Sequence, residues 1–94
     1  MRTIDRATAF RRDYKRVRAT PRHGKDLDAL VSTVVALLSA DQDLPEPYRD
    51  HGLIGDWAGY RECHLKPDLL LIYRKSDAAT LRLARLGSHS DLFG

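Results

Sequence analysis

The sequence predicts an α+β fold in the order β-α-α-β-β-β, with a two-helix hairpin on one face of an antiparallel sheet. Apolar residues recur at helical spacing in the first half of the chain, and in the second half they form short runs separated by turns. With 94 residues and 43% apolar content, the chain can build one compact core but not two. We therefore expect residues 1–94 to form a single domain.

The first half is expected to contain a short strand at residues 2–5 and then two helices. The first helix is amphipathic and very basic, begins near residue 8 and ends before Pro21. The second begins near Lys25, and its apolar residues between positions 27 and 38 form a wide stripe. This stripe predicts the core, and the short connection predicts a helical hairpin.

The second half is expected to form an ordered loop and then three strands. Residues 41–56 hold two prolines, two glycines and five acids, a composition that a helix does not tolerate. Strand-like runs follow at 57–65, 69–75 and 79–86, separated by short turns. The middle run is apolar on both faces, as in a central strand, and the outer two carry charged residues in alternation. Together they predict an antiparallel meander.

The net charge of +3 is unevenly distributed along the chain. Residues 1–25 hold nine lysines and arginines against two acids, whereas residues 26–50 hold one arginine against six acids. Such asymmetry suits a polyanion that contacts one surface, because each neutralised phosphate releases counterions. A helix face that is simply well solvated is the competing interpretation.

The location is expected to be cytoplasmic, without membrane contact. No apolar stretch of signal-peptide type follows the N-terminal charges, and the most apolar region is too short for a membrane span. Cys63 is the only cysteine, so no intrachain disulfide can form. Its place within a strand favours a small buried apolar residue over a nucleophile.

A cluster of chemically active side chains is predicted at one edge of the sheet. His51 lies in the loop, His64 at the end of a strand, and Asp68 just across the following turn. Arg85 stands near the end of the last strand, four residues before His89. Each histidine alone would more often have an ordinary structural role, but their grouping favours a site.

These residue types suit RNA cleavage without a metal. The reaction needs a base for the ribose 2′-hydroxyl, an acid for the 5′-oxygen and a cation for the crowded phosphate. Histidine, whose pKa is about 6.5 in model peptides, can be acid or base, and arginine's fork of donors matches a phosphate. Histidines and an aspartate could instead bind zinc, but no HxxxH, HxH or CxxC motif is present. We expect no metal and no cofactor.

Two segments closely resemble the YafQ group of RelE-like toxins. They are YRDHGLIGDWAGYRECHLKPDLLLIYR at 48–74 and RLGSHSDLFG at 85–94. The most specific features are the D-H-x-L-x-G-x-W-x-G-Y-R-x-x-H-x-x-P-D block and the terminal G-x-H-x-x-L-F-G. The order β-α-α-β-β-β is also that family's. Departures occur at Gly52, Leu69 and Leu86, which bear on codon preference and rate more than on the reaction.

The resemblance implies a ribosome-dependent mRNA endonuclease of a type II toxin–antitoxin system. A cognate antitoxin would wrap around it and keep it inactive, and the complex would repress its own operon by binding operator DNA. The family's active-site positions fall on residues of the same type here: His51, His64, Asp68, Arg85, His89 and Phe93. Phe93, which from its position alone either caps the core or stacks on a base, is thereby assigned to the site.

The resulting hypothesis gives each residue a role. His89 would be the general acid, Asp68 with His51 or His64 would abstract the proton, and Arg85 would stabilise the phosphorane. The residues expected to bind RNA or the ribosome are Arg11, Arg12, Lys15, Arg16, Arg18, Arg22 and Lys25. Two alternatives stay open: a nucleic-acid- or ribosome-binding module without catalysis, and a zinc-dependent hydrolase.

Overall fold

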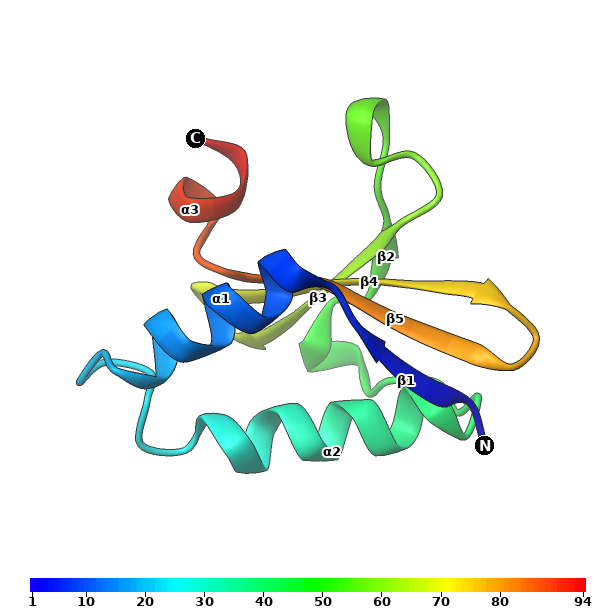
Figure 1. Ribbon diagram of the computed structural model, residues 1–94, viewed down its shortest axis with the longest axis horizontal. Coiled ribbons are helices and arrows are strands. Elements are labelled where there is room, and N and C mark those ends of the chain that lie inside the picture. The colour runs from blue at the N-terminus through cyan, green and yellow to red at the C-terminus, as the bar shows by residue number, and fades with distance from the viewer.

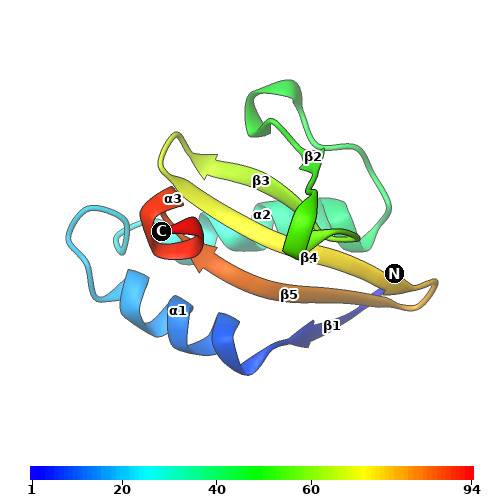
Figure 2. The same ribbon diagram turned by 90° about the horizontal axis from the view of Figure 1, so that it is seen from above.

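A mixed five-stranded sheet organises the computed structural model, which describes residues 1–94. The strands are β1 (Thr3–Arg6), β2 (His51–Gly52), β3 (Arg61–Lys66), β4 (Leu69–Asp77) and β5 (Thr80–Gly87). The helices are α1 (Thr8–Arg18), α2 (Leu27–Ser39) and α3 (His89–Phe93), and two 3-10 turns are η1 (Glu46–Tyr48) and η2 (Gly55–Trp57). The strand order is β1-β5-β4-β3-β2 (Figure 2). The predicted α+β class and element order are confirmed.

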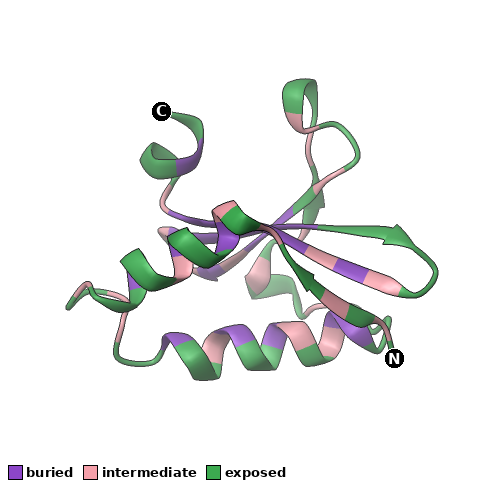
Figure 3. Ribbon diagram, in the orientation of Figure 1, coloured by how far each residue is buried: buried purple, intermediate pink, exposed green.

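The main core lies between one face of the sheet and helices α1 and α2 (Figure 1). α1 buries Phe10 and Val17 against β5, and the apolar stripe of α2 is buried as predicted. Every residue of β4 from 69 to 73 is buried, which confirms the central strand (Figure 3). Cys63 is also fully buried and free, and this burial raises the pKa of its thiol. The predicted packing role of Cys63 is therefore confirmed.

The opposite face carries α3 and the segment 53–60, which rise together from the sheet in Figure 1. Leu92 of α3 packs there on Leu70 and Ile72 of β4. Ser88 caps α3 by accepting from Asp91 N–H, and the Asp91 carboxylate accepts from Ser88 N–H in return. This capping box fixes the start of a short helix that the sequence analysis did not predict.

Three further details differ from the sequence-based expectation. β1 joins the sheet by pairing in parallel with β5, so one edge of the sheet is not antiparallel. The strand expected at 57–65 begins only at Arg61, because Trp57 ends a 3-10 turn and Gly59 has a φ of 91°. Within the expected loop, β2 adds a two-residue strand beside β3.

None of the helices is both long and apolar enough to cross a membrane.

Candidate active site

One register row of the sheet brings distant residues together. His51 of β2 pairs with Glu62 of β3, Glu62 with Ile72 of β4, and Ile72 with Arg85 of β5. His64 stands two residues after Glu62 and therefore projects from the same face. His89 follows the end of β5 as the first residue of α3, on that face. Strand pairing thus assembles side chains that are far apart in the sequence.

Three imidazoles surround a buried carboxylate. The side chain of Glu62 is only 4% exposed, and its Oε1 lies 3.5 Å from His64 Nε2. The Nε2 atoms of His51 and His89 are 3.8 and 3.9 Å from the same oxygen. These distances are long for hydrogen bonds but short for electrostatic interaction. Glu62 Oε1 therefore lies within ion-pair distance of all three rings.

The orientation of His51 is fixed by its own loop. Its Nδ1 is 2.7 Å from the carbonyl oxygen of Arg49, whose backbone is left-handed with a φ of 50°. Because a carbonyl only accepts, Nδ1 carries the proton and donates. In the neutral ring the lone pair then resides on Nε2, the atom that faces Glu62. The preceding residue, Asp50, accepts from Tyr73 Oη and from Arg61 Nε.

The other two histidines and Phe93 form a line of rings. The centroids of His64 and His89 are 6.0 Å apart, as are those of His89 and Phe93. The His64 side chain is 15% exposed, whereas those of His51 and His89 are more than half exposed. Phe93 is 45% exposed. His64 is thus enclosed, whereas the rings of His51, His89 and Phe93 are open to a ligand.

Arg85 and Asp68 lie in different surroundings. The guanidinium of Arg85 donates to Asp13 of α1, and this bond raises the pKa of Arg85. Asp68, in the β3–β4 turn, has Arg22 Nη2 as its ion partner at 3.8 Å, and no ion pair joins it to His51, His64 or His89. The catalytic assignment of Asp68 stays a prediction without support from these contacts.

A hollow of about 650 Å³ opens beside His64. Arg49 and Lys66 give this hollow a basic lining. The remaining lining residues are Pro47, Tyr48, Leu65 and Pro67. No three His, Cys, Asp or Glu side chains in the structure are arranged so that they could hold a metal ion. The residues that line the hollow therefore form a basic recess next to the imidazole cluster.

The seven predicted RNA-binding residues divide into two groups. Four are exposed and have no ion-pair partner, namely Arg11, Arg12, Lys15 and Lys25. The other three are paired, Arg16 with Asp13 and Asp91, Arg18 with Asp28, and Arg22 with Asp68. The unpaired group offers the stronger attraction for phosphate, because its charges are not already compensated.

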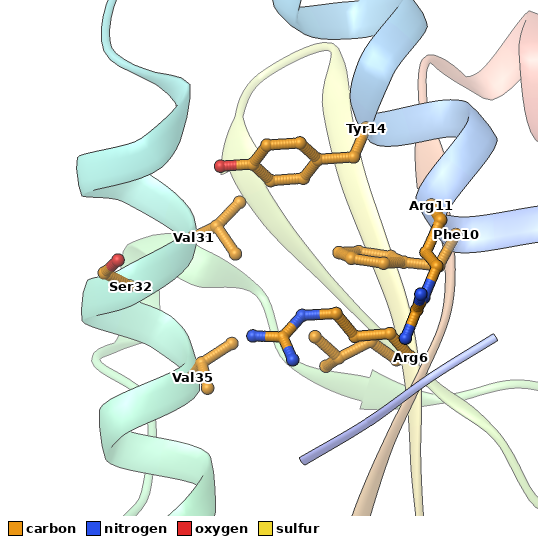
Figure 4. A pocket seen from close by; sticks show the side chains of 8 residues that line it. Arg6, Phe10, Arg11, Tyr14, Val31, Ser32 and Val35 are labelled. Carbon is orange, nitrogen blue, oxygen red and sulfur yellow. The ribbon is translucent and has the colours of Figure 1, made fainter. Parts of the chain in front are cut away.

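A second hollow, an apolar groove of about 280 Å³, separates α1 from α2 (Figure 4). Phe10 and Tyr14 of α1 face Val31 and Val35 of α2 across it. The Tyr14 hydroxyl donates to Asp28; burial and this bond raise the pKa of Tyr14 to about 12. The Tyr14–Asp28 bond thus joins α1 and α2 near the connection between them, and the groove lies farther from that connection.

Sequence reasoning missed Glu62 and Asp13. Glu62 was read only as part of the charged alternation of an outer strand, although its spacing of two from His64 places both on one face. Asp13 belongs to a helix whose other charged residues are all basic, and the sequence analysis did not single it out. It lies three residues after Phe10 and four before Val17, which puts it on the buried face. That spacing was the available signal.

Comparison with known proteins gives a consistent assignment. A family model described as a bacterial toxin of type II toxin–antitoxin system, YafQ, matches residues 2–94. The mRNA interferase toxin YafQ of Escherichia coli (strain K12) is 40% identical over 93 residues, 99% of this chain and 97% of that protein. A chain of the E. coli DinJ–YafQ complex has a TM-score of 0.81 and 38% identity, with both chains fully covered. A metal-bound toxin from Helicobacter pylori has a TM-score of 0.85 and 47% identity, over 99% of this chain and all of that one. The chain therefore belongs to the YafQ family of type II toxin–antitoxin toxins.

Proposed function

We propose that this protein is an endoribonuclease toxin that cuts mRNA on the ribosome and so inhibits translation in the cytoplasm. The observation that carries the proposal is the cluster of three imidazoles around buried Glu62, in the register row of Arg85. The E. coli relative is an mRNA interferase toxin, which agrees with this chemistry.

His51 is the proposed general base. Its Nδ1–H donates to Arg49 O, so Nε2 holds the lone pair that takes the proton from the ribose 2′-hydroxyl. The freed 2′-oxygen attacks the adjacent phosphorus. His64, more enclosed and nearer to Glu62, is the second candidate for this step.

His89 is the proposed general acid. It is exposed at the start of α3 and can protonate the 5′-oxygen as the phosphorus–oxygen bond breaks. Arg85 stabilises the charge that accumulates on the phosphorane, and Phe93 stacks on a neighbouring base. The products are a 2′,3′-cyclic phosphate, or the 3′-phosphate formed by its hydrolysis, and a 5′-hydroxyl end.

The basic face of α1 and the α1–α2 connection would hold the toxin against ribosomal RNA. Unpaired Arg11, Arg12, Lys15 and Lys25 supply this sequence-independent attraction. Binding to ribosomal RNA would then be independent of its sequence, while cleavage depends on the imidazole cluster. This division agrees with an enzyme that cuts messages of many sequences during translation.

A cognate antitoxin would be the protein partner, as in the E. coli DinJ–YafQ complex, and operator DNA would be bound through that complex. The groove between α1 and α2 suits an antitoxin segment with apolar and acidic side chains, because exposed Arg6 and Arg11 flank its apolar lining (Figure 4). Val35→Glu, which adds a carboxylate to the groove, should weaken antitoxin binding at least tenfold. Ala36→Glu, on the exposed side of α2, should leave it unchanged. Equal affinities would place the antitoxin elsewhere.

The test of the proposed function is mRNA cleavage during in vitro translation. The wild-type protein and His89→Ala are compared, each also after treatment with a chelator that is removed before the assay. The proposal expects cuts only in translated message, resistance to chelation, and loss of cutting by at least a hundredfold in His89→Ala. Stalled translation without cuts in both proteins would instead indicate a binding module. Loss of cutting after chelation would indicate a zinc-dependent hydrolase.

A further inference from the structure

The outer edge of β5 is completed by side chains of α1 where β1 no longer reaches it. β1 pairs only with Thr80–Leu83, so the edge beyond Leu83 has no neighbouring strand. There the backbone N–H of Leu86 donates to Asp13 Oδ2 at 3.0 Å. Arg16 Nη2 donates to the carbonyl oxygen of Leu86 at 3.3 Å. Two charged side chains of α1 thus bond the backbone groups of Leu86, which a neighbouring strand would otherwise pair.

Asp13 also holds one side of the Arg85 guanidinium. Arg85 Nε is 2.6 Å from Asp13 Oδ2, and Arg85 Nη2 is 3.2 Å from Oδ1, a two-point contact that fixes the plane of the guanidinium. The Asp13 side chain is only 8% exposed. Burial alone would raise the pKa of Asp13, but the bonds from Arg85 and Leu86 outweigh it and lower the pKa. Arg85 Nη1 has no partner in the protein and is free to donate to a phosphate oxygen.

The same contacts extend to α3. Arg16 lies 3.2 Å from Asp13 Oδ1 through Nη2 and 3.0 Å from Asp91 Oδ2 through Nη1. Asp91 is the capping-box residue of α3, the helix that begins with His89 and ends with Phe93. One arginine therefore joins the carboxylate that holds Arg85 to the carboxylate that fixes the start of α3.

We propose that Asp13, Arg16 and Asp91, here named the α1 brace, are positioning residues that hold Arg85 and α3 in the geometry needed for RNA cleavage. This inference rests on the proposed function, in which Arg85 and His89 act on the phosphate. It gives Arg16 a different role from the one expected from its charge. The brace makes α1 a support of the active site as well as a basic surface.

A double-mutant cycle tests the inference. Asp13→Asn retains the shape and an acceptor for Leu86 N–H but removes the charge that holds Arg85. Cleavage of mRNA on purified, programmed ribosomes is measured for Asp13→Asn in the wild-type and Arg85→Gln backgrounds, at a temperature where circular dichroism shows all variants folded. We expect a loss of about 10- to 100-fold in kcat in the wild-type background. In the Arg85→Gln background the further loss should be less than about threefold, because no positioned guanidinium remains.

Asp5→Asn is the matched control. Asp5 also accepts from an arginine of β5, Arg82, but at the outer edge of the sheet away from the histidines. This variant should leave kcat unchanged. Equal losses from Asp13→Asn in the two backgrounds, or none in the wild type, would overturn the positioning role. Full cleavage by Arg85→Gln would instead overturn the proposed mechanism itself, and the inference with it.

Arg16→Gln gives a second test should Asp13→Asn fail to fold. The side chain of Arg16 is about half exposed, so its replacement perturbs the core less. As a brace residue it should lower kcat about tenfold and leave KM for ribosomes unchanged. Arg12→Gln, which removes an exposed and unpaired arginine of the same helix, should instead raise KM. If Arg16→Gln behaves like Arg12→Gln, Arg16 binds RNA and the brace is refuted.

Discussion

Removing one hydroxyl, in Tyr73→Phe, should slow cleavage by loosening the loop that carries His51. Tyr73 is buried in the core, and its hydroxyl donates to Asp50, the residue before His51. Burial and this bond raise the pKa of Tyr73, so the group stays a neutral phenol and a donor. Without the hydroxyl, Asp50 retains only the 3.3 Å contact with Arg61.

The magnitude follows from the surroundings of Asp50. A hydrogen bond to a charged group contributes about 1.5 to 3 kcal/mol. Because the Asp50 side chain is 23% exposed, water replaces part of this bond, and we expect a loss of about 2 kcal/mol. For a chain of this size that corresponds to a fall in Tm of roughly 8 to 16 °C. A shift of His51 by about 1 Å would lower the cleavage rate by roughly 10- to 100-fold.

The assay combines thermal unfolding with single-turnover cleavage at a temperature where every variant is folded. Leu81→Ala is the control, since it removes a fully buried side chain next to β1, far along β5 from the histidines. It should cost about 2 to 5 kcal/mol of stability but leave cleavage by the folded protein intact. If Tyr73→Phe loses stability yet cleaves at the wild-type rate, the Asp50 contact does not position His51.

Three further outcomes follow from other contacts. In Gly87→Ala the new Cβ would lie 3.0 Å from Asp91 Cβ and 3.1 Å from Asp91 Oδ2, so α3 must shift. Cleavage should therefore fall about tenfold, while the affinity for the antitoxin, measured by calorimetry, stays the same. Asp41 accepts from Lys75 and Arg2, which hold its pKa at about 2, so its contribution to stability is present above pH about 4 and is lost as the pH falls toward 2. Urea unfolding should therefore show Asp41→Asn less stable than wild type at pH 5, with the difference shrinking as the pH falls through 2; a constant difference would contradict this linkage. Lys15→Glu should weaken ribosome binding and reduce its salt dependence, and an unchanged salt slope would place the ribosome on another surface.

The parts of the fold that the sequence predicted are those whose pattern of apolar residues leaves a single way to bury them. The apolar stripe of α2 and the continuous run of β4 can each be buried in one way only, so periodicity determines their elements and their place in the core. β1 is different. Four residues give no indication of a partner, and the parallel pairing with β5 depends on where α1 leads the chain.

The candidate site was predictable by residue type and less so by geometry. His51, His64 and His89 were recognised because imidazoles suit proton transfer, and the structure does gather them. The spacing of Glu62 from His64 is visible in the sequence, but the pairing of Glu62 with His51 depends on the register of a two-residue strand, which no local pattern encodes. Arg16 looked like an RNA ligand because its charge is visible in the sequence, whereas its two carboxylate partners are not.

The parallel pairing of β1 with β5 makes the order of synthesis relevant. The first strand of the chain cannot find its place in the sheet until residues 80–83 have been made, and α1 reaches Arg85 only afterwards. Because chains grow from the N-terminus, a ribosome that translates this message carries a nascent chain without a working site until β5 and α3 have been made. A message cut before the codons for residues 80–93 encodes only polypeptides that lack β5, His89 and Phe93. Such fragments cannot rebuild the enzyme, so cleavage of the toxin's own message would limit its further production.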